Sequence, residues 1–265
     1  MSTQTQVSFL SRADGEKIAY LQEESTCLQE ESTGGNLGVT WLGGFKSDMT
    51  GTKATALADW ARTGNRTYTR FDYFGHGQSS GQFVEGTISR WRDDALAVLD
   101  ELCMGPQILV GSSMGAWVAL LAALARPTQV KALVLIAPAP DFTEALMWEG
   151  FDETIRTTLR TEGIYQQPSD YDEPYEISYR LIEDGRQHLL LGDTIPLSLP
   201  VRILQGMADE DVPWRHAMLL AETLAGDDVT VSLTKSGDHR LSEPDDIERL
   251  TGTLDRLLAD LQRDL

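Results

Sequence analysis

A short segment, Gly111-Ser112-Ser113-Met114-Gly115, constrains the fold of this chain more than any other. An apolar stretch at 107–110 leads into it, and an apolar stretch of helix-forming residues at 116–124 follows it. A strand that turns directly into a helix brings backbone atoms close together, so the residues beside the turn must be small. The segment therefore predicts a nucleophile elbow with the Ser113 hydroxyl exposed at its tip.

Two backbone N–H groups are expected to face the atom that Ser113 attacks. The elbow points the first N–H groups of its helix, beginning with Met114, toward that atom. A second donor should come from the loop after the strand expected at 37–42, where Gly43 and Gly44 permit a tight turn that aims the Phe45 N–H. An ordinary Gly-Gly turn is the alternative for this loop.

A serine hydroxyl needs a base within hydrogen-bond distance, and that base needs a carboxylate to fix its tautomer. Of the four histidines, His239 lies in a loop after the last predicted strand, where an α/β-hydrolase fold carries its base. His76 sits between glycines and is expected to pack in a loop. His188 and His216 are expected to be surface or structural residues.

The acid is expected in the turn that follows the strand at 201–205. We prefer Asp209 because it comes early in this turn, and Asp211 is the alternative. Asp238 is the weakest candidate, because it adjoins His239 and neighbouring side chains diverge. Ser113, Asp209 and His239 then follow the chain order Ser, Asp, His that is typical of α/β hydrolases.

Strands and helices alternate along most of the 265 residues. Apolar or alternating stretches predict strands at 7–10, 17–21, 37–42, 66–71, 107–110, 131–137, 201–205 and 229–233. Helices are expected at 53–62, 87–99, 116–124 and 214–224, and from 244 onward. This order predicts an α/β-hydrolase fold, with a mostly parallel sheet flanked by helices.

The pattern changes at 141–200, which holds thirteen acids, four arginines and no lysine. Two or three short helices and no buried strand are expected there. We interpret 141–200 as a small helical cap inserted into a core domain formed by 1–140 and 201–265. Its apolar residues should roof an acyl pocket, and a substrate carboxylate would need a local cation. The cap offers Arg156, Arg160, Arg180 and Arg186, whose alternative role is pairing with neighbouring acids.

The formal net charge of −19 argues against nucleic acid or an anionic membrane as a partner. Cys27 and Cys103 fit neither a metal site nor a disulfide framework, so free thiols are expected. Without a G-x-G-x-x-G segment or a His/Cys cluster, no cofactor or metal is expected. The first residues lack a signal-peptide pattern, and no stretch reaches the ~20 apolar residues of a membrane span. We therefore expect a cytoplasmic protein that acts on a small molecule.

A tandem duplication follows the second predicted strand. The sequence Leu-Gln-Glu-Glu-Ser-Thr at 21–26 recurs at 28–33. Two copies rich in glutamate and serine cannot bury a coiled-coil seam. A surface loop or an extended hairpin edge, without a chemical role, is therefore expected.

Several segments resemble the ABHD10-like group of α/β hydrolases. The resemblance runs from about Gly43 to the C-terminus and lies in 44–54, 70–73, 105–115, 206–209, 212–214 and 238–240. It implies Ser113 as nucleophile, Asp209 as acid and His239 as base. It also implies activity on acyl glucuronides or on palmitoylated protein cysteines, as described for animal members. The chain departs from those members in its repeat at 21–33 and in the expected absence of their mitochondrial leader.

The main hypothesis is therefore a serine esterase or thioesterase that acts through an acyl-enzyme. A small-molecule receptor that keeps the three residues but turns over slowly is one alternative. An acyltransferase or a carbon–carbon bond hydrolase with the same residues is another. Dehalogenase and epoxide hydrolase chemistry is disfavoured, because those enzymes use an aspartate nucleophile and position 113 is serine.

Overall fold

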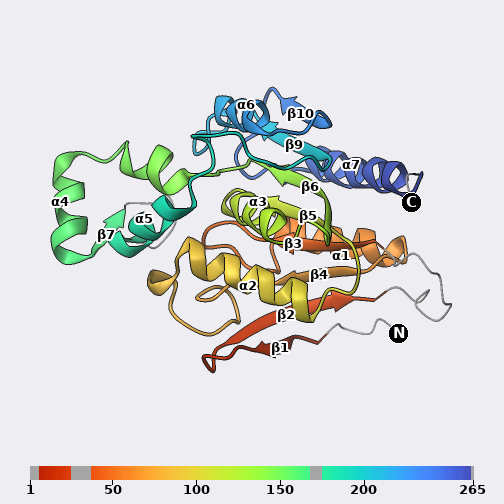
Figure 1. The fold of residues 1–265 in the computed structure, drawn as a ribbon, viewed down its shortest axis with the longest axis horizontal. Helices are drawn as coiled ribbons and strands as arrows, with labels where there is room; N and C mark the ends of the chain where they lie inside the picture. The colour runs from red at the N-terminus through yellow and green to blue at the C-terminus, as the bar shows by residue number, and fades with distance from the viewer. Residues whose placement is uncertain (1–5, 25–36, 168–174, 264–265) are drawn as a thin grey trace.

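A computed structural model describes residues 6–24, 37–167 and 175–263. Its centre is an eight-stranded sheet in the order β1-β2-β4-β3-β5-β6-β9-β10 (Figure 1). Strand β2 pairs antiparallel with β1 and β4, and the remaining neighbours in the sheet are parallel. The strands are β1 Ser8–Ser11, β2 Lys17–Glu23, β3 Gly38–Leu42, β4 Tyr68–Phe71, β5 Gln107–Ser112, β6 Val130–Ile136, β9 Val201–Gly206 and β10 Val229–Thr234.

Helices cover both faces of this sheet (Figure 1). Strand β5 shows why, because its side chains alternate between two apolar clusters. Leu109 packs in the cluster that includes α2, α3 and α6, whereas Ile108 and Val110 pack with α1 and α7. The predicted mostly parallel sheet flanked by helices is confirmed. The helices are α1 Thr52–Thr63, α2 Ile88–Glu101, α3 Met114–Ala125, α6 Trp214–Thr223 and α7 Pro244–Arg263.

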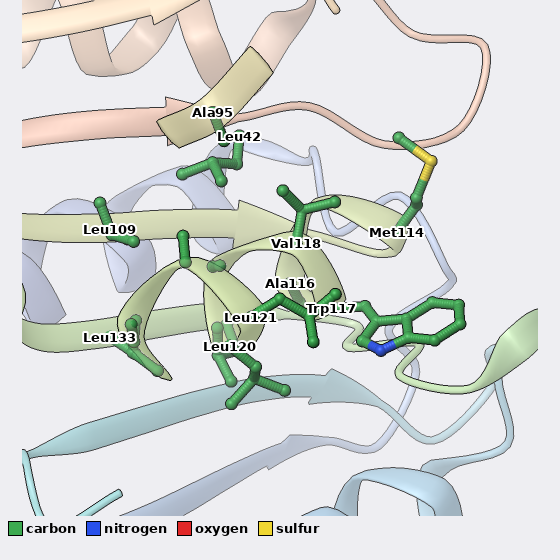
Figure 2. Packing of buried hydrophobic residues seen from close by; sticks show 14 of the residues in the cluster. Leu42, Ala95, Leu109, Met114, Ala116, Trp117, Val118, Leu120, Leu121 and Leu133 are labelled. Carbon is green, nitrogen blue, oxygen red and sulfur yellow. The ribbon is translucent and has the colours of Figure 1, made fainter. Parts of the chain in front are cut away.

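Helix α3 is the most deeply buried helix of the described chain. It is apolar on all sides because it packs between α2 and the sheet. Figure 2 shows Trp117, Val118 and Leu120 pointing from α3 into the surrounding core. The start of α3 is therefore held rigidly, and Ser113 is the residue just before it.

The segment between β6 and β9 forms a lobe that projects beyond one end of the sheet (Figure 1). The lobe has a small apolar cluster of its own, which contains Trp148, Leu159, Ile177 and Ile182. Residues 189–200 then return to the main core, where Ile195 and Leu197 are buried. The lobe contains η3 Thr143–Trp148, α4 Glu153–Glu162, β7 Ile164–Gln167, β8 Tyr175–Ser178 and α5 Tyr179–Gly185.

The lobe differs from its prediction in containing a strand pair. Strands β7 and β8 form an antiparallel two-stranded sheet, and Ile177 in β8 is fully buried. Each strand has four residues, too few for an alternating pattern to stand out from the surrounding polar sequence. Tertiary packing in the lobe, rather than local pattern, therefore determines this pair.

Several smaller expectations can be compared with the structure only in part, because some of their residues lie outside the described ranges. Cys103 is a free, buried thiol, whereas Cys27 lies outside the described residues. Strand β2 contains the first residues of the tandem repeat, and residues 25–33 of the repeat lie outside the described part. Across the described ranges, no helix has both the length and the apolar character to cross a membrane.

Candidate active site

Ser113 lies at a sharp turn between β5 and α3. Its backbone has φ 55° and ψ −118°, a left-handed conformation that costs about 1–3 kcal/mol for a non-glycine residue. The Ser113 N–H donates to the Ile136 carbonyl on the neighbouring strand β6 at 2.8 Å. The rigid helix on one side and the sheet on the other thus hold the strained residue in place.

The two flanking glycines are required by close backbone contact. A Cβ at Gly111 would overlap the backbone of Ala116, and one at Gly115 would overlap the Leu42 carbonyl oxygen. The tight packing of α3 against β5 and β3 therefore excludes a side chain at either position. The predicted strand–turn–helix geometry is present in full.

The structure brings Ser113, His239 and Asp209 into one line of hydrogen bonds. His239 Nε2 lies 3.0 Å from Ser113 Oγ, and His239 Nδ1 lies 2.8 Å from Asp209 Oδ2. An imidazole protonated on Nδ1 satisfies both contacts, because it donates to the carboxylate and accepts from the hydroxyl. These residues can therefore move a proton from the hydroxyl to the ring while the carboxylate stabilises the resulting cation.

Two loops carry Asp209 and His239 to the same end of the sheet. Asp209 follows β9 and His239 follows β10, its parallel neighbour. The two loops are joined by backbone hydrogen bonds, from Met207 N–H to the Thr234 carbonyl at 2.8 Å and from Ala208 N–H to the Gly237 carbonyl at 3.0 Å. Parallel pairing of the two strands thus sets the distance between the two side chains.

Asp209 is a fully buried carboxylate with four donors around it. Its Oδ1 accepts the N–H groups of Asp211 and Val212, at 3.0 and 2.8 Å. Its Oδ2 accepts the Gln205 side-chain amide at 3.0 Å as well as His239. Asp211 itself is exposed, and the Asp238 carboxylate accepts the Leu241 N–H at 2.9 Å, which closes a turn away from the ring.

A metal ion is an alternative partner for the carboxylates and the imidazole at this site. Asp209, Asp211 and His239 could bring three ligand atoms within 4.8 Å of one another. However, the four hydrogen bonds to Asp209 use the lone pairs that a cation would need, and His239 Nδ1 is already paired with that carboxylate. The donor set therefore fits a hydrogen-bonded triad rather than a metal site.

The loop after β3 lies close to Ser113, because a Cβ built at Gly44 would lie 3.5 Å from the Ser113 Cβ. The Gly44 N–H donates to Ser47 Oγ at 3.0 Å, the Lys46 N–H to His76 Nε2 at 3.2 Å, and the Ser47 N–H to the Gly44 carbonyl at 3.1 Å. Within the described chain, the Phe45 N–H and the Met114 N–H have no such acceptor. Both therefore remain available for a substrate oxygen.

The Phe45 side chain links this loop to the inserted lobe. Its ring makes edge contacts with Phe83, Trp91 and Phe142, at centroid distances of 4.7, 5.9 and 5.6 Å. It also lies 6.2 Å from the ring of Tyr175 in β8. The position of the Phe45 N–H therefore depends on packing from both the core and the lobe.

The other histidines have structural partners. His76 is buried, donates from Nδ1 to the Phe74 carbonyl at 3.1 Å, and has its pKa lowered to about 4 by burial. His188 contacts Ser89 Oγ at 2.7 Å, and burial lowers its pKa. His216 donates from Nε2 to the Pro140 carbonyl at 2.7 Å. The expected structural roles of these three residues agree with their contacts.

A cleft of about 1160 Å³ opens beside Ser113. Apolar residues of the lobe line one part of it, namely Phe142, Leu146, Met147 and Ile177. Polar and charged residues line another part, namely Lys46, Ser47, Asp48, Lys53, Glu210, Asp211, Arg240 and Ser242. The cleft beside Ser113 thus has both apolar and polar lining residues.

The cap arginines do not line this cleft. Arg160 pairs with Glu153 at 2.9 Å, Arg186 with Glu144 at 2.7 Å, and Arg156 donates to the Trp148 carbonyl. The alternative role, pairing with neighbouring acids, therefore describes Arg160 and Arg186, whereas Arg156 is held by a carbonyl. The cations that do line the cleft are Lys46, Lys53 and Arg240.

Sequence reasoning missed two polar residues beside the site. Gln205 is a polar residue at the end of the predicted strand 201–205, directly after the apolar pair Ile203 and Leu204 and four residues before Asp209, and this position was a usable signal. Lys53 lies in the first turn of α1, where a cation opposes the helix dipole, and that local conflict was a second signal.

Several known proteins resemble this chain in sequence or in fold. A family model described as serine aminopeptidase, S33, matches residues 39–161. Palmitoyl-protein thioesterase ABHD10, mitochondrial, from Bos taurus is 39% identical over 259 residues, which cover 97% of this chain and 81% of that protein. Among solved structures, alpha/beta hydrolase domain-containing protein 10 from mouse has a TM-score of 0.86 at 36% identity, covering 97% of this chain and 99% of that one. A putative hydrolase from Agrobacterium vitis S4 has a TM-score of 0.88 at 42% identity, covering 96% and 98%.

Proposed function

The chain belongs to the ABHD10 family of α/β-hydrolase-fold proteins, and from that premise we propose that it hydrolyses esters or thioesters of apolar acyl groups through an acyl-enzyme on Ser113. Membership makes the protein an enzyme of the serine hydrolase class. The observation that carries the proposed mechanism is the continuous hydrogen-bonded line from Ser113 through His239 to Asp209.

In the first half of the reaction, Ser113 Oγ attacks the acyl carbonyl carbon as its proton passes to His239 Nε2. The carbonyl oxygen becomes an oxyanion and accepts hydrogen bonds from the Phe45 and Met114 N–H groups. The tetrahedral intermediate collapses with loss of the thiolate or alkoxide, which takes the proton from His239. Asp209 holds the ring by Nδ1 and stabilises its charged form throughout.

In the second half, water attacks the acyl-enzyme carbonyl and gives its proton to the same imidazole nitrogen. The bond between the acyl carbon and Ser113 Oγ then breaks, and Oγ recovers the proton. The products are a free carboxylic acid and the restored hydroxyl. No cofactor enters this scheme.

We propose 141–200 as the cap of this site, over the core formed by 1–140 and 201–265. Its Phe142, Leu146, Met147 and Ile177 would receive an apolar acyl chain. The name of the Bos taurus relative specifies palmitoyl-protein substrates, which fits an apolar acyl surface next to an open polar one. Acyl glucuronides are a second candidate class, because the cationic residues Lys46 and Arg240 line the polar surface.

Labelling with a fluorophosphonate, followed by a chain-length series of p-nitrophenyl esters and acyl thioesters, tests the proposal. We expect labelling and burst kinetics in the wild type, with medium or long acyl chains preferred over acetate. Ser113→Ala should lose labelling and roughly 10⁴-fold or more in kcat, and adding His239→Ala should cost little more. Labelling without turnover on any substrate would instead favour a receptor, and acyl transfer to an added alcohol would favour an acyltransferase.

The cellular location is a separate proposal. We retain a cytoplasmic location as a prediction, whereas the printed name of the Bos taurus relative places that protein in mitochondria. Fractionation of cells that express this chain would decide between the two.

A further inference from the structure

Lys53 occupies an electrostatically unfavourable position at the start of α1. It is the second residue of the helix, and the first turn contains no acidic residue. A cation near a helix N-terminus is opposed by the helix dipole. Lys53 is nevertheless half-buried and lines the cleft beside Ser113 and His239. A local conflict of this kind indicates that the side chain is held there by some other contact.

That contact is with the loop that carries His239. Lys53 Nζ donates to the carbonyl oxygen of Arg240, the residue directly after His239, and lies 3.4 Å from Ser242 Oγ. The Ser242 hydroxyl donates to the same Arg240 carbonyl at 3.0 Å. Two side chains, one charged and one neutral, thus donate to the carbonyl of the residue that follows His239.

Other parts of the loop have hydrogen bonds of their own, from the Ala208 N–H to the Gly237 carbonyl and from the Leu241 N–H to the Asp238 carboxylate. The loop has no regular secondary structure between β10 and α7, and Leu241 within it has a φ of 44°, which is strained for leucine. His239 must nevertheless reach both Ser113 Oγ and Asp209 Oδ2 at once. A displacement of even about 1 Å would break this line and could cost ~10²-fold in rate.

We propose that Lys53 is a positioning residue for the hydrolytic reaction, whose ammonium group holds the Arg240 carbonyl and thereby keeps the His239 imidazole between Ser113 and Asp209. This inference rests on the proposed function and adds a residue to it. Lys53 does not touch the reacting atoms in this role. It joins the N-terminus of α1 on the oxyanion side of the cleft to the loop of the base.

The environment of Lys53 predicts that the reaction rate depends on pH. Burial lowers the pKa of Lys53 to about 8, while Asp238 and Asp246 oppose this shift and Arg240 adds to it. Asp246 also pairs with Arg249 at 2.8 Å. As the pH rises through 8, the ammonium becomes a neutral amine and its hydrogen bond to the Arg240 carbonyl weakens. We therefore expect kcat of the wild type to decline above pH 8.

Three variants test the inference on a neutral p-nitrophenyl ester. Lys53→Met keeps the length of the side chain but removes its charge and donors, and should lower kcat roughly 10- to 100-fold with little change in KM. Lys53→Arg keeps the charge at high pH and should recover most of the activity without the decline above pH 8. Lys131→Met, at an exposed lysine on β6, is the matched control and should behave as wild type.

The outcomes separate a positioning role from the alternatives. An unchanged kcat in Lys53→Met would overturn the inference, as would a rise in KM for anionic substrates alone, which indicates a substrate contact. If circular dichroism shows that Lys53→Met does not fold, Lys53→Arg provides the test. A decline of its kcat above pH 8 like that of the wild type would then overturn the inference. The rate of fluorophosphonate labelling is measured in parallel for the wild type and the variants, as a readout of the proposed function itself. Failure of the proposed function would appear in the wild type itself, as neither labelling nor turnover.

Discussion

The side-chain amide of Gln205 and the imidazole of His239 donate to the same oxygen of Asp209. Gln205 Nε2 lies 3.0 Å from Asp209 Oδ2, and His239 Nδ1 lies 2.8 Å from it. Gln205 is fully buried on β9, beneath the turn that carries the carboxylate. The orientation of the carboxylate is therefore set by the strand as well as by its own turn.

Replacing Gln205 with methionine should lower kcat about tenfold and leave KM nearly unchanged. Methionine keeps the volume but cannot donate, so Asp209 loses one of four hydrogen bonds and turns more freely. Steady-state kinetics on a neutral ester measure the effect. Gln107→Met is the matched control, because Gln107 is also buried in a central strand but contacts Thr40, away from the site. Equal kcat values in the two variants would contradict the prediction.

Asp209→Asn should reduce kcat by roughly 10⁴-fold, whereas Asp211→Asn should leave it close to wild type. Both oxygens of Asp209 accept from two donors, so an asparagine amide would face donors in either orientation. Asp211 is exposed, and it is its backbone N–H that contacts Asp209. The comparison of kcat at one pH decides the assignment. A reversed pair of results would place the acid two residues later.

The main parts of this site could be predicted from sequence because each follows a strand of a parallel sheet. Ser113, Asp209 and His239 lie at the carboxyl ends of β5, β9 and the neighbouring strand β10, where parallel strands gather their loops. Short-range signals such as the paired glycines marked the elbow. Fold and candidate residues therefore required only local pattern and chain order.

Contacts between distant segments could not be predicted in this way. The bond from Lys53 to Arg240 joins residues 187 positions apart, and the contact of Phe45 with Tyr175 joins the core to the lobe. The cap arginines illustrate the reverse case. Their residue type suits a carboxylate, but local acids and a carbonyl hold three of them outside the cleft. Residue type suggests what a side chain can bind, and packing decides what it meets.

Ser113→Gly should raise the free energy of unfolding by about 1 kcal/mol while abolishing activity. Glycine relieves the strain at φ 55°, and this gain exceeds the added entropy of the unfolded chain. Ser113→Ala is the control, since alanine keeps the strain and loses only the hydroxyl. Urea unfolding of the three proteins measures the difference. A glycine variant no more stable than the alanine variant would show that the elbow stores no strain at this residue.

His76 should make the protein less stable in mild acid. Burial lowers its pKa to about 4 in the folded state, whereas the unfolded chain takes up a proton near 6.5. Between these values the unfolded state binds more protons, so the free energy of unfolding falls as the pH falls from 6.5 toward 4. The loss should total roughly 3 kcal/mol by pH 4. Both ring nitrogens are engaged in the folded state, by the Phe74 carbonyl and the Lys46 N–H, and the second contact needs a neutral ring.

His76→Phe isolates this effect, because phenylalanine keeps a ring against Tyr73, Phe83 and Trp91 but does not titrate. Asp94 lies nearby with its pKa raised to about 6 by burial, and its effect on stability has the opposite sign over a similar range. The Asp94 effect is common to the wild type and His76→Phe, so it cancels in the difference between their free energies of unfolding. The stability advantage of the wild type over His76→Phe at pH 7 should therefore shrink, and then reverse sign or vanish, as urea unfolding is repeated toward pH 4. A difference that stays constant with pH would mean that His76 is protonated equally easily in the folded and unfolded states.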